Sequence, residues 1–274
     1  MYKIMLCQMY PTLGEIYRNA DKHYTAIERA ISAGCNIILF PELSLTGYCL
    51  RDLTSSVAIN EKHEIFSKLL DYSKYITIIF GFIYDSSDYL LYNAAGCLED
   101  GAVKHIHKKV YLPDYTMFEE ARYYARGDSF EIFHTKYGKI GILICEDALH
   151  LSSLYITARQ VPEILCVLSN SPARGTFQKG FYSMDTWESF CKVISITITT
   201  NLLFVNRVGV EEGITFWGGS CLYSPFGDKL GTLPLLEEGE MIVELNDDII
   251  KRGRLTSPFY RDDRPDIMKK YLVK

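Results

Sequence analysis

The sequence predicts an α/β fold. Short apolar runs typical of strands alternate with longer stretches of helical period through most of the 274 residues. Hydrophobic residues make up 48% of the chain and charged residues 23%, as in ordinary globular proteins. No low-complexity tract and no linker rich in Pro, Gly or Ser interrupts the pattern, so we expect one domain rather than two.

The first elements follow in a simple order. Residues 3–8 form an apolar run typical of a strand, and apolar side chains then repeat at helical spacing over residues 16–33. Gly34 is placed to end that helix. Residues 36–40 predict a buried strand that ends at Pro41, and a helix over 60–74 and a strand over 77–84 come next.

The pattern changes between residues 89 and 145. Consecutive strands separated by turn signals predict hairpins there. A helix at 151–160, a strand at 164–168, a helix at 183–195 and a strand at 202–206 then form a second series. We expect residues 1–250 to form the domain and the charge-rich segment 251–274 to be a C-terminal extension that packs on the surface or on a partner subunit.

Charge and hydropathy exclude some classes of partner. The chain carries 29 basic and 34 acidic residues, a net charge of −5, whereas nucleic-acid and anionic-membrane binders carry a basic surplus. No apolar run approaches the length of a membrane span. We therefore predict neither a nucleic-acid nor a membrane partner.

The eight cysteines suggest a reducing compartment. They lie 14 to 48 residues apart and none forms a CxxC pair, which argues against a zinc ribbon or a redox motif. The N-terminus lacks the long apolar region of a signal peptide. We expect a cytoplasmic protein with free thiols.

Cys145 is the first candidate for chemistry. It follows the apolar strand at 139–144 and precedes Glu146, Asp147 and a predicted helix. Sites in α/β sheets gather at the carboxyl ends of strands, where backbone N–H groups can favour a thiolate and an oxyanion. The alternative is that Cys145 is simply a small buried hydrophobe.

Glu42 and a lysine also stand at strand ends. Glu42 follows the apolar strand at 37–40, and it is either a buried functional carboxylate or a surface residue of the turn that Pro41 and Gly47 favour. Lys108 and Lys109 close another strand. Because strand side chains alternate, only one of the two lysines can point inward.

Together these residues resemble the signatures of the nitrilase, or carbon-nitrogen hydrolase, superfamily. The matching segments are PELSLTGY with Glu42, KVYLP with Lys109 and ICED with Cys145, in the order and at the spacing of that family. The resemblance runs from residue 3 to about residue 246 and includes NSP at 170–172, NRVG at 206–209 and FWGGS at 216–220. The segment at 112–128 is similar to the glutaminase domain of glutamine-dependent NAD synthetases and to free-standing amidases near it.

The resemblance implies a fold and an assembly. The fold is an α-β-β-α sandwich, with two mixed β-sheets face to face and helices outside. The expected assembly is a homodimer or a larger homo-oligomer.

The resemblance also implies catalytic roles for Glu42, Lys109, Cys145 and Glu120. Cys145 would attack the substrate carbon, and Lys109 with the backbone N–H of Glu146 would hold the oxyanion. Glu42 would protonate the leaving ammonia and later activate water. Glu120 would position Lys109 or the substrate nitrogen.

This chemistry depends on matched proton affinities. A free Cys has a pKa near 8.5 and a Glu near 4.3, so proton transfer from thiol to carboxylate is uphill by roughly 6 kcal/mol. We expect burial of Glu42 and the ammonium of Lys109 to close most of that gap.

Further residues are predicted to form the substrate pocket or to bind substrate. They are Tyr48, Tyr115, Phe118, Glu146, Asn170, Ser171, Arg174 and Trp217. For Arg174 a structural ion pair is an equally good interpretation. His105 and His107 form an HxH pair without a third ligand nearby in sequence, so we predict no metal and no cofactor.

The resulting hypothesis is a thiol amidohydrolase that cleaves a non-peptide C–N bond of a small amide and releases ammonia through a cysteinyl thioester. One alternative is a stand-alone glutaminase that supplies ammonia to a separate synthetase. Another is a catalytically silent homologue that only binds a ligand.

Overall fold

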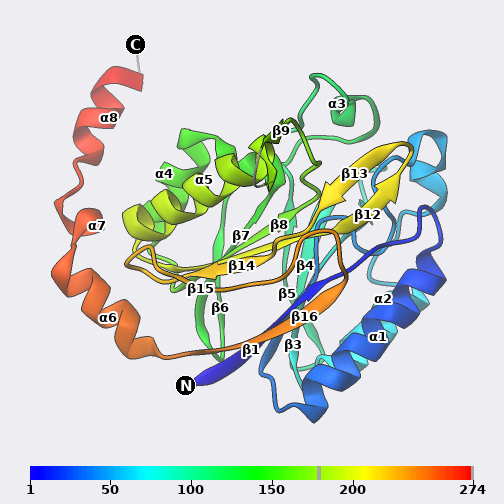
Figure 1. The fold of residues 1–274 in the computed structure, drawn as a ribbon, viewed down its shortest axis with the longest axis horizontal. Coiled ribbons are helices and arrows are strands. Elements are labelled where there is room, and N and C mark those ends of the chain that lie inside the picture. Colours follow the sequence, from blue (N-terminus) through cyan, green and yellow to red (C-terminus); the bar gives the residue numbers. More distant parts are fainter. Residues whose placement is uncertain (178–179, 273–274) are drawn as a thin grey trace.

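Two large sheets face each other in the computed structural model, which describes residues 1–177 and 180–272 (Figure 1). Helices α1 (Ile16–Ser32) and α2 (Glu64–Tyr72) cover the outer face of one sheet, and α4 (Leu151–Gln160) and α5 (Tyr182–Ile198) cover the outer face of the other. This arrangement confirms the predicted α-β-β-α sandwich.

The first sheet has the strand order β16-β1-β2-β3-β4-β5. Its strands are β1 (Tyr2–Gln8), β2 (Ile37–Leu39), β3 (Thr77–Asp85), β4 (Leu91–Glu99), β5 (Ala102–Lys108) and β16 (Gly239–Leu245). Strand β1 pairs parallel with β2 and antiparallel with β16, and β2 pairs parallel with β3. The sheet is therefore mixed.

The second sheet has the order β15-β14-β11-β8-β7-β6. Its strands are β6 (Ile132–Thr135), β7 (Gly138–Ile144), β8 (Ile164–Ser169), β11 (Asn201–Asn206), β14 (Cys221–Tyr223) and β15 (Lys229–Thr232). Strands β7, β8 and β11 run parallel, and the strands outside them pair antiparallel. Two short ribbons pair β9 (Thr176–Phe177) with β10 (Gly180–Phe181) and β12 (Val208–Glu211) with β13 (Ile214–Trp217).

The inner strands, such as β2 and β8, are apolar because both faces of each sheet are covered there. In β1, Ile4 and Leu6 belong to the core between the sheets, whereas Met5 and Cys7 pack with α1 residues such as Ile27. Residues of one strand alternate between two cores, so the sequence shows a continuous apolar run instead of a polar and apolar alternation.

The order of the longer helices and strands up to residue 206 agrees with the sequence prediction, with shifts of a few residues at several ends. The predicted helix at 60–74 begins only at Glu64, and a 3₁₀ helix at Arg51–Ser56 precedes it. The sequence prediction missed the short helix α3 (Glu120–Tyr123), the short strands β9 and β10, and the strands after residue 206.

The C-terminal segment is helical. It contains α6 (Asp247–Thr256), α7 (Phe259–Asp262) and α8 (Pro265–Leu272), and the expected boundary at residue 251 lies inside α6. Tyr155 of α4 donates to Asp263 at 2.9 Å, and Arg159 donates to the carbonyl of Tyr260 at 2.9 Å, so this segment passes over the second sheet's helices. Residues 273–274 of the predicted extension lie outside the described residues.

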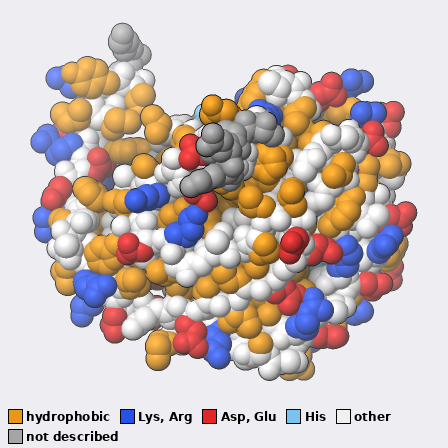
Figure 2. Space-filling view, in the orientation of Figure 1, with side chains coloured by type: hydrophobic (Ala, Val, Ile, Leu, Met, Phe, Trp, Pro, Cys, Tyr) orange, Lys and Arg blue, Asp and Glu red, His pale blue; other side chains and the backbone are white. Residues whose placement is uncertain are grey.

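Helix α8 projects from the body of the molecule (Figure 1). None of its residues is buried in the single chain. Figure 2 shows apolar and basic side chains next to each other along this projecting segment. Among residues 1–177 and 180–272, no helix is long and apolar enough to cross a membrane.

Candidate active site

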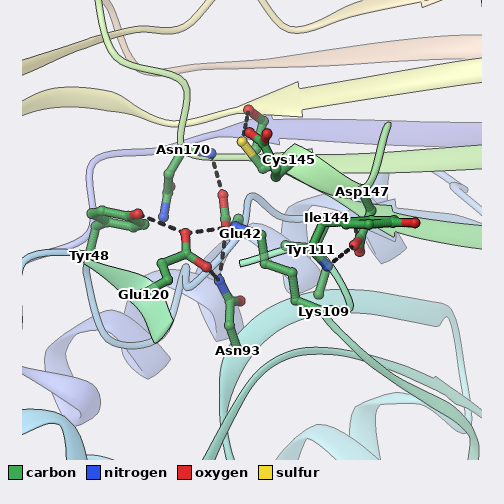
Figure 3. A network of polar contacts seen from close by, with 12 residues as sticks. Glu42, Tyr48, Asn93, Lys109, Tyr111, Glu120, Ile144, Cys145, Asp147 and Asn170 are labelled. Carbon is green, nitrogen blue, oxygen red and sulfur yellow. Dashed lines mark hydrogen bonds and ion pairs between the residues drawn. The ribbon is translucent and has the colours of Figure 1, made fainter. Parts of the chain in front are cut away.

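The predicted catalytic residues meet where strands of both sheets end. Glu42 follows β2 and Lys109 follows β5, both in the first sheet, while Cys145 follows β7 in the second. Strand β2 is parallel to β3, and β5 runs in the same direction as β3 because both are antiparallel to β4. The carboxyl ends of β2 and β5 therefore lie on the same side of the sheet. The sandwich therefore brings together residues that are far apart in the sequence (Figure 3).

Glu42 is held by backbone packed tightly against β3. A Cβ at Gly81 would lie 2.4 Å from the Leu43 nitrogen and 2.5 Å from the Pro41 carbonyl oxygen, so only glycine lets this turn approach the strand. The backbone N–H of Asn170, just beyond the end of β8, donates to Glu42 Oε2 at 2.7 Å. This bond ties Glu42 in the first sheet to the second sheet.

The ammonium of Lys109 is buried between two carboxylates. Its Nζ donates to Glu42 Oε1 at 2.8 Å and to Glu120 Oε1 at 2.7 Å, and the Lys109 side chain is fully shielded from solvent. Burial by itself lowers the pKa of Lys109, but Glu120 and Glu42 outweigh it and raise the pKa well above its ordinary value. Lys109 is therefore a permanent cation and is unsuited to act as a base.

Lys108 points elsewhere. Its Nζ lies 4.3 Å from the centre of the Tyr92 ring and 5.7 Å from that of Tyr84. The expected alternation thus directs Lys109 into the cluster and Lys108 away from it.

Glu120 lies at the start of α3 and completes the cluster. Besides Lys109, its carboxylate accepts a hydrogen bond from the Tyr48 hydroxyl at 2.7 Å. Asn93 Nδ2, from β4, donates to Glu42 Oε1 at 2.7 Å and reaches Glu120 Oε2 at 3.5 Å. Burial raises the pKa of Glu120 to about 7, although Lys109 pulls it downward.

Cys145 begins the 3₁₀ helix Cys145–Leu149 in an unusual backbone conformation. Its φ of 44° lies in the left-handed region, which non-glycine residues seldom adopt and which recurs at functional sites. The Ser169 hydroxyl donates to its sulfur at 3.6 Å. Cys145 is thus held at a sharp turn between β7 and the helix.

The thiol is harder to ionise than the sequence argument expected. Burial and the neighbouring Glu42 raise the pKa of Cys145, while Lys109 and the Ser169 hydrogen bond lower it by less. Lys109 thus lowers the pKa of the thiol, as expected, but burial and Glu42 outweigh its effect in this arrangement. The physical reason is that burial disfavours the thiolate and the carboxylates of Glu42 and Glu120 oppose the single ammonium.

A cavity of about 300 Å³ opens beside Cys145. Its walls include Tyr115, Phe118, Glu146, Ser171 and Arg174, all predicted to bind substrate, together with Trp187 of α5. Tyr115 donates to Glu146 Oε2 at 2.9 Å. The guanidinium carbon of Arg174 lies 4.6 Å from the centre of the Phe118 ring.

Three other predicted substrate residues do not line this cavity. Tyr48 borders a separate cavity of about 290 Å³ on the Glu120 side. Asn170 contributes its backbone to Glu42, and within the described residues its side-chain amide has no hydrogen-bond partner. Trp217 is buried beneath the site and donates to the Ser171 hydroxyl at 3.0 Å.

Sequence reasoning missed Asn93, Ser169 and Trp187. Asn93 is a buried amide in an otherwise apolar strand, and that exception in the run LYNAAGCL was the available signal. Ser169 is the last residue of β8 and thus stands at a strand end, as Cys145 does. Nothing in the sequence distinguishes Trp187 from the other aromatic residues of a helix.

The HxH pair is engaged in other contacts. His107 Nε2 bonds to Asp147 Oδ2 at 2.9 Å, and His105 stacks on Phe133 with ring centres 4.7 Å apart. Burial and the neighbouring His107 lower the pKa of His105 to about 4. In the part of the chain that the structure describes, no three His, Cys, Asp or Glu side chains gather as a metal-binding group.

Comparison with known proteins identifies the family. The family model described as carbon-nitrogen hydrolase matches residues 3–253. The chain is 29% identical to the glutamine-dependent NAD(+) synthetase of Acinetobacter baylyi, over 86% of this chain and 43% of that protein. It is 26% identical to the N-carbamoylputrescine amidase of Arabidopsis thaliana, over 94% of this chain and 91% of that protein.

The solved structures agree on the fold. The crystal structure of a carbon-nitrogen hydrolase from Helicobacter pylori superimposes with a TM-score of 0.87 at 23% identity, covering 100% of this chain and 98% of that one. The chain spans less than half the length of the curated NAD synthetases that it matches. On the strength of the family match and the fold, the chain belongs to the carbon-nitrogen hydrolase family, whose members include amidases and the glutaminase-like domains of NAD synthetases.

Proposed function

We propose that the chain is a thiol amidohydrolase that cleaves a non-peptide C–N bond of a small amide and releases ammonia through a cysteinyl thioester. The observation that carries this proposal is the position of the Cys145 thiol. It lies in the wall of a cavity of about 300 Å³, within the electrostatic influence of the buried cluster of Glu42, Lys109 and Glu120.

In the first step the Cys145 sulfur attacks the amide carbonyl carbon, and its proton passes to Glu42. Because the pKa of the thiol is raised, this proton leaves as the S–C bond forms and not beforehand. Negative charge then develops on the carbonyl oxygen. The Lys109 ammonium and the backbone N–H of Glu146 stabilise it.

Glu42 next delivers the proton to the substrate nitrogen, the C–N bond breaks and ammonia leaves. Water adds to the thioester carbonyl while Glu42 accepts one of its protons. The C–S bond then breaks, the proton returns to sulfur, and a carboxylic acid departs with the thiol restored. Throughout, Glu120 holds the Lys109 ammonium in place through their 2.7 Å ion pair.

The cavity favours a substrate that carries a carboxylate. Arg174 Nη2 is buried and, among the described residues, has no hydrogen-bond partner. The guanidinium lies against Phe118, and both residues line the cavity with Cys145. A planar guanidinium whose Nη2 has no partner among the described residues is suited to bind a carboxylate at the end of the acyl group away from the amide.

A stand-alone glutaminase is the second candidate. The similarity to glutamine-dependent NAD synthetases supports it, and glutamine itself carries a carboxylate that Arg174 could bind. In that case the ammonia would pass to a separate synthetase. Ammonia release from glutamine, compared with release from other amides, separates the two candidates.

The working form that we propose is a cytoplasmic homodimer. The apolar side chains of α8, at Ile267, Met268, Tyr271 and Leu272, are between 37% and 74% exposed in the single chain. Burying them on a second copy would remove apolar surface from water. The C-terminal extension would then contribute to the subunit interface.

An ammonia-release screen tests the proposal. The substrates are neutral amides, amides bearing a carboxylate, carbamoyl amines and glutamine, assayed in EDTA with Cys145→Ala as the blank. We expect release from at least one class by the wild type and none by the variant. A folded wild type that releases ammonia from no class would instead favour a silent ligand-binding homologue.

A further inference from the structure

The side chain of Asp147 joins the two strand ends that carry Lys109 and Cys145. Its Oδ1 accepts hydrogen bonds from the backbone N–H groups of Val110 at 3.0 Å and Tyr111 at 2.9 Å, the two residues after Lys109. Its Oδ2 accepts one from the N–H of Ile144, the residue before Cys145, at 3.1 Å. One carboxylate thus fixes the backbone on either side of the site (Figure 3).

These strand ends belong to different sheets. Val110 and Tyr111 continue from β5 of the first sheet, and Ile144 ends β7 of the second. Backbone hydrogen bonds of a ladder cannot set the distance between two sheets that pack face to face, because each ladder lies within its own sheet. The Asp147 bonds cross from one sheet to the other at the point where Lys109 and Cys145 must face a common substrate atom.

His107 completes the arrangement. Its Nε2 bonds to Asp147 Oδ2 at 2.9 Å, and both side chains are almost wholly buried. Since the carboxylate already accepts three backbone N–H bonds, the imidazole is the donor in this fourth bond. His107 also lies on β5 two residues before Lys109, so it anchors the carboxylate to the strand that carries the lysine.

We infer that Asp147 and His107 are positioning residues that set the place of the Lys109 ammonium relative to the Cys145 sulfur. Neither lines the cavity beside Cys145, so they act through the backbone that they hold. The inference rests on the proposed function for its kinetic part, but the reactivity of Cys145 tests it separately. A displacement of about 1 Å at such a site costs roughly 100-fold in rate.

The test compares His107→Phe, His107→Gln, Asp147→Asn and His105→Phe. Phenylalanine keeps an aromatic ring at position 107 but has no N–H group to donate to Asp147. The side-chain amide of glutamine can donate such a hydrogen bond. His105→Phe is the matched control, because His105 lies two residues away on the same strand and stacks on Phe133. Each variant is assayed for kcat, KM and thermal midpoint, and for the pH profile of iodoacetamide alkylation at Cys145.

We expect His107→Phe to lower kcat about 10-fold or more with KM within about two-fold, and His107→Gln to recover most of that loss. Asp147→Asn should lower kcat further, because its NH₂ group faces N–H donors, and circular dichroism is used to check that this variant folds. In His107→Phe and Asp147→Asn the pH profile of Cys145 alkylation should move to higher pH, because the Lys109 ammonium no longer faces the Cys145 sulfur. His105→Phe should match the wild type.

The inference is overturned if His107→Phe keeps the wild-type kcat and alkylation profile per folded molecule and only lowers the thermal midpoint. It is also overturned if His105→Phe and His107→Phe lose activity equally. If the wild type releases no ammonia from any amide, the proposed function fails, but the alkylation profiles still decide the role of Asp147 and His107.

Discussion

Lys109 Nζ lies 2.7 Å from Glu120 Oε1, and both side chains are almost completely buried. A second carboxylate, that of Glu42, lies 2.8 Å from the same nitrogen. Two acids therefore share one ammonium in a site from which water is largely excluded. Burial, together with this excess of negative charge, explains why the pKa of Cys145 is raised although a cation is close by.

The charge of Lys109 should be essential. Lys109→Met keeps similar bulk but removes the oxyanion partner, and we expect kcat to fall by about 100-fold or more. Alkylation of Cys145 by iodoacetamide should also slow. We expect Lys109→Arg to lower kcat as well, because a planar guanidinium is larger than the ammonium and distributes its charge differently.

Lys108→Met is the internal control for Lys109. Its Nζ lies over the Tyr92 ring, so the substitution should cost no more than about 1 kcal/mol of stability and leave turnover intact. Turnover and thermal unfolding of the three lysine variants provide the measurement. An inactive Lys108→Met beside an active Lys109→Met would show that the wrong lysine has been chosen.

Activity should depend on pH through Glu120. Its pKa is raised to about 7, so the carboxylate that holds Lys109 is lost as pH falls through that value, and activity should fall with it. The Tyr48 hydroxyl donates to the ionised carboxylate and lowers this pKa. Tyr48→Phe should therefore move the acidic limb of the kcat profile to higher pH, by about one unit. An unchanged limb, or one displaced to lower pH, would refute this role of Glu120.

Arg174 should discriminate between anionic and neutral substrates. Arg174→Ala should raise KM for an amide bearing a carboxylate by about 10-fold or more, with a smaller effect on kcat. A neutral amide of the same length is the control and should be affected little. If KM rises equally for the two substrates, Arg174 supports the pocket structurally and does not select the carboxylate.

The apolar side of α8 should be required for dimerisation. Ile267 and Tyr271 are four residues apart on one side of the helix and exposed by 43% and 71%. Replacing both with Glu should give a monomer by light scattering, whereas Lys270→Glu should leave the dimer intact. A wild-type chain that is monomeric at micromolar concentration, or a double variant that still dimerises, would contradict this interface.

Glu42, Lys109 and Cys145 each follow a strand, but that position alone left a structural role equally open for them, and the family resemblance was needed to select them as candidates. Alternation says that one of Lys108 and Lys109 points inward but not which; the resemblance selected Lys109, and in the structure it is Lys109 that contacts Glu42 and Glu120. Glu120 came from the family resemblance alone, because nothing local marks it among the charged residues of its segment.

Other features depend on contacts between distant segments. Asn93 bridges Glu42 and Glu120 from a strand about 50 residues from one and about 30 from the other, and no local pattern encodes such a bridge. Trp217 was expected in the pocket wall, but β13 runs beneath Ser171 and buries it. Strand β16 forms by pairing with β1 at the opposite end of the chain, and its exposed positions weaken the apolar pattern that identifies strands.

In the proposed mechanism, turnover proceeds through an acyl thioester on Cys145. The most direct measurement is to mix the enzyme with an accepted amide, quench in acid within the first turnovers and determine the mass of the Cys145 peptide. We predict an added mass equal to the acyl group on Cys145, no adduct and no ammonia with Cys145→Ala, and normal behaviour of the control Cys35→Ala. Ammonia release by Cys145→Ala at the wild-type rate, or an acyl group found on another residue, would contradict the account.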